Sequence, residues 1–175
     1  MKRTKVRKVE AGEVKMLQLI SRKTFYEAFS EENISKYLQE EFSLKKLTEQ
    51  LATPSSEFYF ATSEENIIGY VKLNFGDSQT AIKDASGVEI ERIYVLKEYQ
   101  GRKVGQLLFE KAMSVAAERH ADYIWLGVWE KNFRAIGFYE RNGFTVFDKH
   151  VFMLGDDAQT DLMMKRSRVI THGPD

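Results

Sequence analysis

The chain has 175 residues, and its 26 Lys and Arg balance 26 Asp and Glu, so a formal net charge of zero argues against broad binding to nucleic acid. The absence of cysteine excludes disulfides, thiolate metal sites and a Cys nucleophile. No run approaches 18 apolar residues, and the basic start lacks the apolar run of a signal peptide, so we expect a cytoplasmic protein without a membrane segment.

The first third of the chain is predicted to hold one strand and three helices. Alternation over Thr4–Val9 indicates a strand, and the apolar residues of Glu13–Phe29 recur near helical spacing. Two shorter helical patterns cover Asn33–Glu41 and Leu44–Leu51, and they end before Pro54.

The middle of the chain is predicted to be rich in strands. Glu57–Thr62 and Ile67–Phe75 form a hairpin pattern around a polar connection. Gly76–Gly87 is polar and small, which predicts a loop, and the sequence leaves open whether this loop closes over a substrate. Val88–Leu96 alternates strongly, which predicts a further strand.

Helices and strands alternate in the last third. Arg102–Arg119 is predicted to be a helix with one apolar face, and Tyr123–Trp129 a buried strand. Asn132–Arg141 is predicted to be a helix that an Asn-Gly pair terminates. Phe144–Met153 and Thr160–Lys165 are predicted to form the last strand pair.

This order predicts an α/β (α+β) fold with a mixed, mostly antiparallel sheet of about seven strands and helices on both faces. One parallel crossover through the 102–119 helix joins the strands at 88–96 and 123–129. These central strands can splay past the crossover, which leaves a slot for a ligand. We expect a single domain over residues 1–167 and a flexible tail over residues 168–175.

The turn before the 102–119 helix suits phosphate. A helix N-terminus offers unsatisfied backbone N–H groups and the positive end of a dipole. Gly105 removes a side chain where a pyrophosphate would approach the backbone, and Arg102 and Lys103 add positive charge. The spacing fits neither a Walker loop nor a dinucleotide fingerprint, and an ordinary turn remains the alternative.

Gln100, Gly105 and the preceding Ile93-x-Val95 resemble motif A of the GNAT superfamily of N-acetyltransferases, whose core is Q/R-x-x-G-x-G/A. Lys103 stands where the family usually has glycine, and in helical geometry it would still donate its N–H. The resemblance implies that the backbone of residues 100–105 holds the pyrophosphate of acetyl-CoA. It also implies that the backbone of residues 93–95 pairs with the pantetheine like an added strand.

A second segment matches the other GNAT signature, N-x-x-A-x-x-F-Y-x-x-x-G-F, in register at Asn132, Ala135, Phe138, Tyr139, Gly143 and Phe144. Two motifs in the correct order identify the chain as a member of the superfamily over roughly residues 57–166. When an amine attacks a thioester, a phenol can protonate the leaving thiolate. By resemblance Tyr139 has this role and Asn132 hydrogen-bonds the cofactor; without the family, Tyr139 would be a core aromatic.

The cofactor-binding set that the resemblance implies is Ile93, Tyr94, Val95, Gln100, Gly101, Arg102, Lys103, Val104, Gly105, Gln106, Asn132 and Tyr139.

Glu89 and Glu91 are the candidates for a general base, so the catalytic candidates are Tyr139, Glu91 and Glu89. Strand alternation predicts that both carboxylates share a face with Ile93 and Val95. One carboxylate would take the amine proton, directly or through water; it could equally hold a cationic substrate or form a surface salt bridge. A backbone N–H near residues 93–95 would stabilise the oxyanion.

The acceptor is expected to be a small-molecule amine. The segments EIERIYV, WLGVWEKN and GDDAQTDLMM resemble PaiA-type polyamine acetyltransferases, which implies spermidine or spermine and an acidic site. Trp125 and Trp129 have the same parity and are predicted to share a face. Acidic candidates in the early helices, which could also be merely solvated, are Glu31, Glu32, Glu40 and Glu41.

Other readings stay open at this point. Protein N-termini, lysine side chains and aminoglycosides are alternative acceptors, and a CoA-binding sensor with little turnover is an alternative class. No metal is expected, because His120, His150 and His172 lack ligand spacing. We expect neither nucleic acid nor a membrane as partner, and a homodimer remains open.

Overall fold

The computed structural model describes residues 3–28, 34–154 and 156–168. Within these ranges the elements follow the predicted order. They are β1 (Thr4–Lys8), α1 (Val14–Ala28), α2 (Ile34–Glu41), α3 (Leu44–Ala52), β2 (Ser56–Ser63), β3 (Asn66–Phe75), β4 (Gly87–Val95), α4 (Val104–Glu118), β5 (Tyr123–Trp129), α5 (Phe133–Arg141), β6 (Thr145–Leu154) and β7 (Asp157–Ser167). Phe29, Glu31, Glu32, Asn33, His172 and the tail after residue 168 lie outside the described residues.

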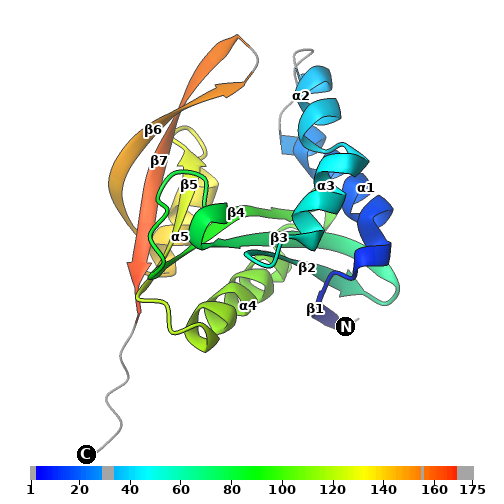
Figure 1. The fold of residues 1–175 in the computed structure, drawn as a ribbon, viewed down its shortest axis with the longest axis horizontal. Coiled ribbons are helices and arrows are strands. Elements are labelled where there is room, and N and C mark those ends of the chain that lie inside the picture. The colour runs from blue at the N-terminus through cyan, green and yellow to red at the C-terminus, as the bar shows by residue number, and fades with distance from the viewer. Residues whose placement is uncertain (1–2, 29–33, 155, 169–175) are drawn as a thin grey trace, which may run out of the picture.

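A single sheet orders these strands as β1-β2-β3-β4-β5-β7-β6 (Figure 1). Every neighbouring pair is antiparallel except β4 and β5. The prediction of a mixed, mostly antiparallel sheet of about seven strands is therefore confirmed. In the part of the chain described, no helix is both long and apolar enough to cross a membrane.

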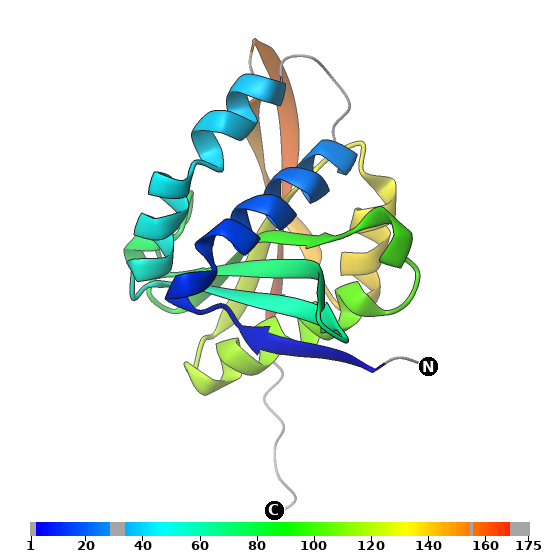
Figure 2. The same ribbon diagram turned by 90° about the vertical axis from the view of Figure 1, so that its right-hand side faces the viewer.

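Helices cover both faces of the sheet, as Figures 1 and 2 show. One face packs against α4 and α5 and the other against α1 and α3, so the sheet separates two apolar cores. The α4 helix buries Leu108, Ala112 and Val115, which recur at helical spacing. Ser43 caps α3 by accepting a hydrogen bond from the backbone N–H of Lys46.

The parallel strands β4 and β5 separate soon after they meet. Their pairing covers only Gly87–Glu89 against Tyr123–Trp125. Beyond these residues the two strands diverge in Figure 1, so the facing edges of residues 90–95 and 126–129 lack a strand partner among the described residues. This confirms the predicted splay and creates the slot on which the site is built.

Strand β4 contains a bulge that the sequence did not reveal. Lys72 of β3 pairs with Arg92, and the next residue, Leu73, pairs with Ile90. Glu91 is therefore the extra residue on β4. A bulge of this kind shifts the alternation of all side chains that follow it.

The prediction that Glu89 and Glu91 share a face of the sheet with Ile93 and Val95 is therefore wrong. Ile93 and Val95 pack against the core beside α4. Glu89 and Glu91 lie on the opposite face, where Asn74 of β3 bonds both carboxylates. Alternation would hold only in a regular strand, and the bulge breaks it at Glu91.

Candidate active site

A cleft of about 1240 Å³ lies where β4 and β5 part. Its sides come from α1 and α2, from the turn into α4 with α5, and from the β6–β7 hairpin. Predicted residues that line it are Glu89, Glu91, Ile93, Tyr94, Val95, Gln100, Gly101, Lys103, Val104, Gly105, Gln106, Asn132 and Tyr139. Arg102 is absent from this lining; its guanidinium lies 5.4 Å from the ring centre of Tyr99.

The turn into α4 leaves backbone N–H groups free at the cleft. Lys103 is the N-cap of the helix, and its side chain makes no capping hydrogen bond. The first helical backbone bond runs from Leu107 N–H to the Lys103 carbonyl. The N–H groups of Val104, Gly105 and Gln106 therefore have no acceptor inside the helix, which is the arrangement that favours an anion.

The geometry of Lys103 differs from the prediction. Its φ of 63° is left-handed rather than helical, and Gly101 two residues earlier has φ of 76°. The sequence prediction that α4 begins at Arg102 is wrong for the same reason, because two left-handed residues delay the helix to Val104. The glycine that the family usually has here therefore relieves a left-handed backbone.

Amide side chains hold this turn against its neighbours. Gln100 donates to the Val95 carbonyl (3.2 Å) and accepts from Arg134 of α5 (2.9 Å). Gln106 donates to Asn142 (3.1 Å), which donates back to it (3.3 Å). These contacts fix the free amides of α4 relative to both β4 and α5.

Tyr139 is buried on α5 at the edge of the cleft. It packs against Phe138 and Phe144, and burial raises the pKa of its phenol. Among the described residues nothing hydrogen-bonds its hydroxyl. The phenol therefore stays protonated at neutral pH and is free to donate. Asn132 has a second task beside lining the cleft, because its Oδ1 caps α5 by accepting from the backbone N–H of Ala135 (3.2 Å).

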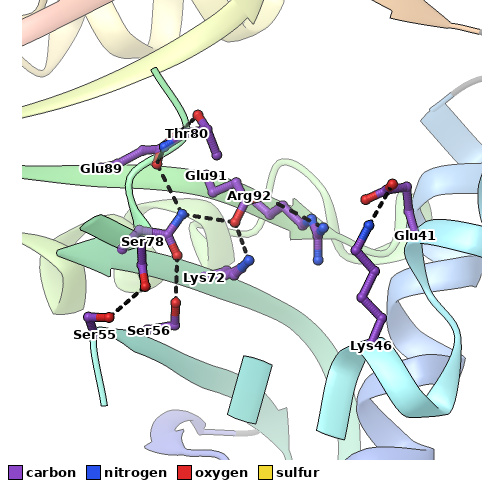
Figure 3. A network of polar contacts seen from close by, with 11 residues as sticks. Glu41, Lys46, Ser55, Ser56, Lys72, Ser78, Thr80, Glu89, Glu91 and Arg92 are labelled. Carbon is purple, nitrogen blue, oxygen red and sulfur yellow. Dashed lines mark hydrogen bonds and ion pairs between the residues drawn. The ribbon is translucent and has the colours of Figure 1, made fainter. Parts of the chain in front are cut away.

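The two β4 carboxylates share one hydrogen-bond donor (Figure 3). Asn74 Nδ2 donates to Glu89 Oε2 (3.0 Å) and to Glu91 Oε2 (2.9 Å), while its Oδ1 accepts from Ser56 (3.0 Å). Thr80 donates its hydroxyl and its backbone N–H to Glu89. Both carboxylates are therefore held in place, and Glu89 also anchors the loop between β3 and β4.

The environments of the two glutamates shift their pKa values in opposite directions. Burial raises the pKa of Glu89 even though Thr80 and Asn74 stabilise its anion. Burial also acts on Glu91, but the charges of Arg92 and Lys72 outweigh it and lower its pKa. Glu91 forms ion pairs with both cations. Opposite shifts in neighbouring acids are a common feature of acid–base sites.

The loop between β3 and β4 is tied to the cleft at a second point. Trp125 donates from Nε1 to Gln79 Oε1 (2.7 Å), and Gln79 Nε2 donates to the Asp84 carbonyl (2.8 Å). Trp129 lines the same cleft, as the predicted shared face of the two tryptophans requires.

Sequence reasoning missed the β3 side chains beneath the glutamates. Lys72 and Asn74 are buried, and they alternate with apolar residues along β3. The signal that could have found them is polar side chains inside an otherwise apolar strand adjacent to the Glu pair. Of the early acidic candidates, Glu41 lines the cleft and pairs with Lys46 (2.7 Å), whereas Glu40 is exposed beside Lys36.

Metal ligands do not gather at this site. Among the side chains that the structure describes, no group of three or more His, Asp or Glu is placed to hold a metal ion.

Comparisons with known proteins agree with this geometry. A sequence profile of the acetyltransferase (GNAT) family matches residues 22–144. An uncharacterised N-acetyltransferase of Lactobacillus delbrueckii subsp. lactis is 42% identical over 154 residues, which cover 86% of this chain and 89% of that protein. A spermidine N(1)-acetyltransferase of Thermoplasma acidophilum is 26% identical over 151 residues, 82% of this chain and 89% of the relative. The crystal structure of the PaiA N-acetyltransferase of the same organism, in complex with coenzyme A, superposes with a TM-score of 0.77 at 23% identity, over 95% of this chain and 99% of that chain.

Proposed function

This chain belongs to the GNAT family of acyl-CoA-dependent N-acetyltransferases, and we propose that its acceptor is a polyamine such as spermidine or spermine. The observation that carries the proposal is a pair of carboxylates in the cleft, Glu89 and Asp161, that form no ion pair with Lys or Arg among the described residues. Glu41, Glu89, Glu91 and Asp161 line the space beside the splayed strands. A spermidine acetyltransferase at 26% identity supports the same class of acceptor. A cation that arrives with the ligand can pair with Glu89 and Asp161, whereas Glu41 and Glu91 already have cationic partners in the chain.

The residues around the splay fit acetyl-CoA. In the described part of the chain, the edge of residues 90–95 that faces away from β3 has no strand partner. The N–H groups of Ile93 and Val95 on that edge are free for the carbonyls of an extended pantetheine, whereas the Val95 carbonyl accepts from Gln100. The free N–H groups of residues 104–106 suit a pyrophosphate, and Gly105 keeps the approach open. Acetyl-CoA supplies the acetyl group as a thioester. The chain supplies the strand edge and the amides that orient it.

Tyr139 is the general acid in this proposal. Its burial keeps the phenol protonated at neutral pH, and it faces the cleft between the α4 turn and β5. A proton delivered from this hydroxyl neutralises the departing thiolate.

Glu89 is the better candidate for the general base. Its raised pKa brings it nearer to neutral pH, and no Lys or Arg within the described ranges forms an ion pair with it. Glu91 is held as an anion by Lys72 and Arg92, which offset its charge and lower its pKa, so it is the poorer proton acceptor.

The test is acetyl-CoA-dependent thiol release with a panel of amines: spermidine, spermine, lysine peptides and aminoglycosides. The chain has no cysteine, so it adds no thiol signal of its own. We expect kcat/KM to be highest for the polyamines. A higher kcat/KM for lysine peptides would replace the polyamine with a protein acceptor, and acetyl-CoA binding without turnover of any amine would favour a sensor.

A further inference from the structure

We propose that Asp161, flanked by Trp125 and Trp129, binds a second ammonium group of the acceptor and thereby selects long diamines and polyamines over monoamines. The inference rests on the proposed polyamine acceptor, and it adds to it the residue that recognises the distal charge. Asp161 comes from β7, far in the sequence from both GNAT motifs.

Strand pairing places Asp161 beside the tryptophans. In the sheet it stands opposite Trp129 of β5. A Cβ built on Gly127, between the two tryptophans, would lie 3.6 Å from Asp161 Oδ2. The carboxylate therefore lies over Gly127, on the face of β5 that Trp125 and Trp129 share, and it lines the cleft.

Asp161 has no cationic partner in the described parts of the chain. Two other partly buried carboxylates do: Glu57 pairs with Arg119 (2.7 Å) and Glu41 with Lys46 (2.7 Å). Burial raises the pKa of Asp161, and only His150, opposite it on β6, acts against this. A carboxylate partly withdrawn from water and left unpaired gains most from a cation that arrives with the ligand.

The two indole rings strengthen a site for an ammonium group. Aromatic faces attract cations, and tryptophan does so most strongly. Trp125 is buried, and its hydrogen bond to Gln79 fixes the ring before any ligand binds. A site organised in advance loses less entropy when it binds.

The position of Asp161 also sets a length. Trp125 pairs with Glu89 of β4, whereas the Asp161 carboxylate lies over Gly127, two residues further along β5. Two residues of strand span about 7 Å, and the step from β4 to β5 adds the spacing between strands. An acceptor whose reacting amine lies near Glu89 must be long to reach Asp161, so the distal charge is read together with the length of the chain.

The test uses the intrinsic fluorescence of the protein. Both tryptophans of the sequence lie in this cleft, so fluorescence excited selectively at tryptophan reports on it. We would titrate the full chain, saturated with coenzyme A so that no turnover occurs, with diaminooctane and with nonylamine. These probes have equal chain length and differ in a terminal ammonium against a methyl group.

Diaminooctane is expected to bind the wild type more tightly than nonylamine does. Asp161→Asn should raise the Kd of diaminooctane by roughly tenfold or more, as loss of a charge-assisted contact implies, and leave the Kd of nonylamine unchanged. Asp148→Asn, an exposed acid on β6 outside the cleft, is the matched control and should change neither Kd.

Three results would overturn the inference: equal binding of the two probes by the wild type, an unchanged diaminooctane Kd in Asp161→Asn, or equal weakening of both probes. Failure of the proposed function is a separate result. If polyamines bind with the Asp161 dependence but are not acetylated, the cation subsite stands and the polyamine acceptor is wrong.

Discussion

At the scale of single residues, Tyr139 is the side chain whose environment most restricts its chemistry. We predict that Tyr139→Phe lowers kcat by roughly a hundredfold to ten-thousandfold, because the general acid is removed while the ring that packs against Phe138 and Phe144 is kept. Steady-state thiol release gives kcat, and calorimetric titration gives acetyl-CoA affinity, which should stay within a few fold. A mutant with wild-type kcat would remove Tyr139 from the mechanism.

Lys103 has a strained, left-handed backbone conformation, and its side chain makes no capping hydrogen bond that would offset the strain. We predict that Lys103→Gly raises the free energy of unfolding by up to about 1 kcal/mol, because glycine tolerates a φ of 63°. Gly101→Ala is the matched control: its φ of 76° should make alanine destabilising by about 1 kcal/mol. Urea unfolding measures both, and equal effects in the same direction would contradict the left-handed turn.

Glu91 couples the stability of the site to pH. We predict that Glu91→Gln lowers the free energy of unfolding at neutral pH by roughly 3 kcal/mol, because it leaves Lys72 and Arg92 buried without their anion. The folded pKa of Glu91 is depressed, so its stabilisation is present above the unfolded value of 4.5 and is lost as pH falls through the folded value.

The difference between wild type and Glu91→Gln should therefore shrink on acidification below pH 4.5, as urea unfolding at a series of pH values would show. Lys72→Met combined with Glu91→Gln is the control, and it should recover part of the loss. A difference that is constant with pH would mean that the ionised Glu91 carboxylate is not what stabilises the fold.

At the scale of elements, substitutions of Gly105 in α4 are expected to affect the stability of the fold and the binding of coenzyme A differently. A Cβ on Gly105 would lie 4.0 Å from the Val95 side chain, which is ordinary contact. We predict that Gly105→Ala raises the free energy of unfolding by about 0.5–1 kcal/mol, because alanine favours a helix more than glycine does.

Gly105→Glu, by contrast, should weaken coenzyme A binding, since it adds bulk and negative charge beside the free amides of α4. Calorimetric titration of both variants with coenzyme A is the measurement. Wild-type affinity in Gly105→Glu would refute the placement of the pyrophosphate at this turn.

Strand β4 shows why sequence reasoning predicted many of the residues that line the cleft but not the face of the sheet on which each lies. The motif around residues 100–106 is local in the chain, so its resemblance to motif A of the family was enough to predict a phosphate-binding turn there. The face of the sheet on which Glu91 lies depends on how β4 pairs with β3. The bulge between Ile90 and Arg92 results from the pairing of the two strands and not from β4 alone. Similarly, no local signal connects Asp161 with Trp129, because β7 inserts between β5 and β6.

At the scale of the whole molecule, the separation of β4 and β5 implies that coenzyme A binding stabilises the folded protein. We predict that coenzyme A at a hundred times its Kd raises the free energy of unfolding by about 2.7 kcal/mol. Hydrogen exchange should slow at the backbone amides of residues 93, 95 and 104–106, since these N–H groups face the cleft without a strand or helix partner among the described residues. Protection confined to β1 or β6 would contradict the proposed path of the cofactor.

The overall architecture was more predictable than the site. Alternating and helical patterns predicted the strands and α-helices of the described part of the chain, because most of them bury one face against the sheet or a core. The splay also followed from sequence order, since a single parallel crossover interrupts an otherwise antiparallel sheet. The sequence did not predict the register of neighbouring strands. This register depends on the pairing of segments that are distant in the sequence, and it decides which side chains are in contact.

The cleft draws its walls from different parts of the chain, and this has a consequence for descent. The strand edge, the free amides and Tyr139 come from residues 87–142, whereas α1, α2 and the β6–β7 hairpin come from the two ends. Mutations in the segments that flank residues 87–142 can therefore change which amine is bound, while the central segment continues to bind the acetyl donor. Duplicated copies of such a gene would be expected to diverge first in residues 14–41 and 145–167, and chimeras exchanged at those borders should inherit acceptor preference with the ends.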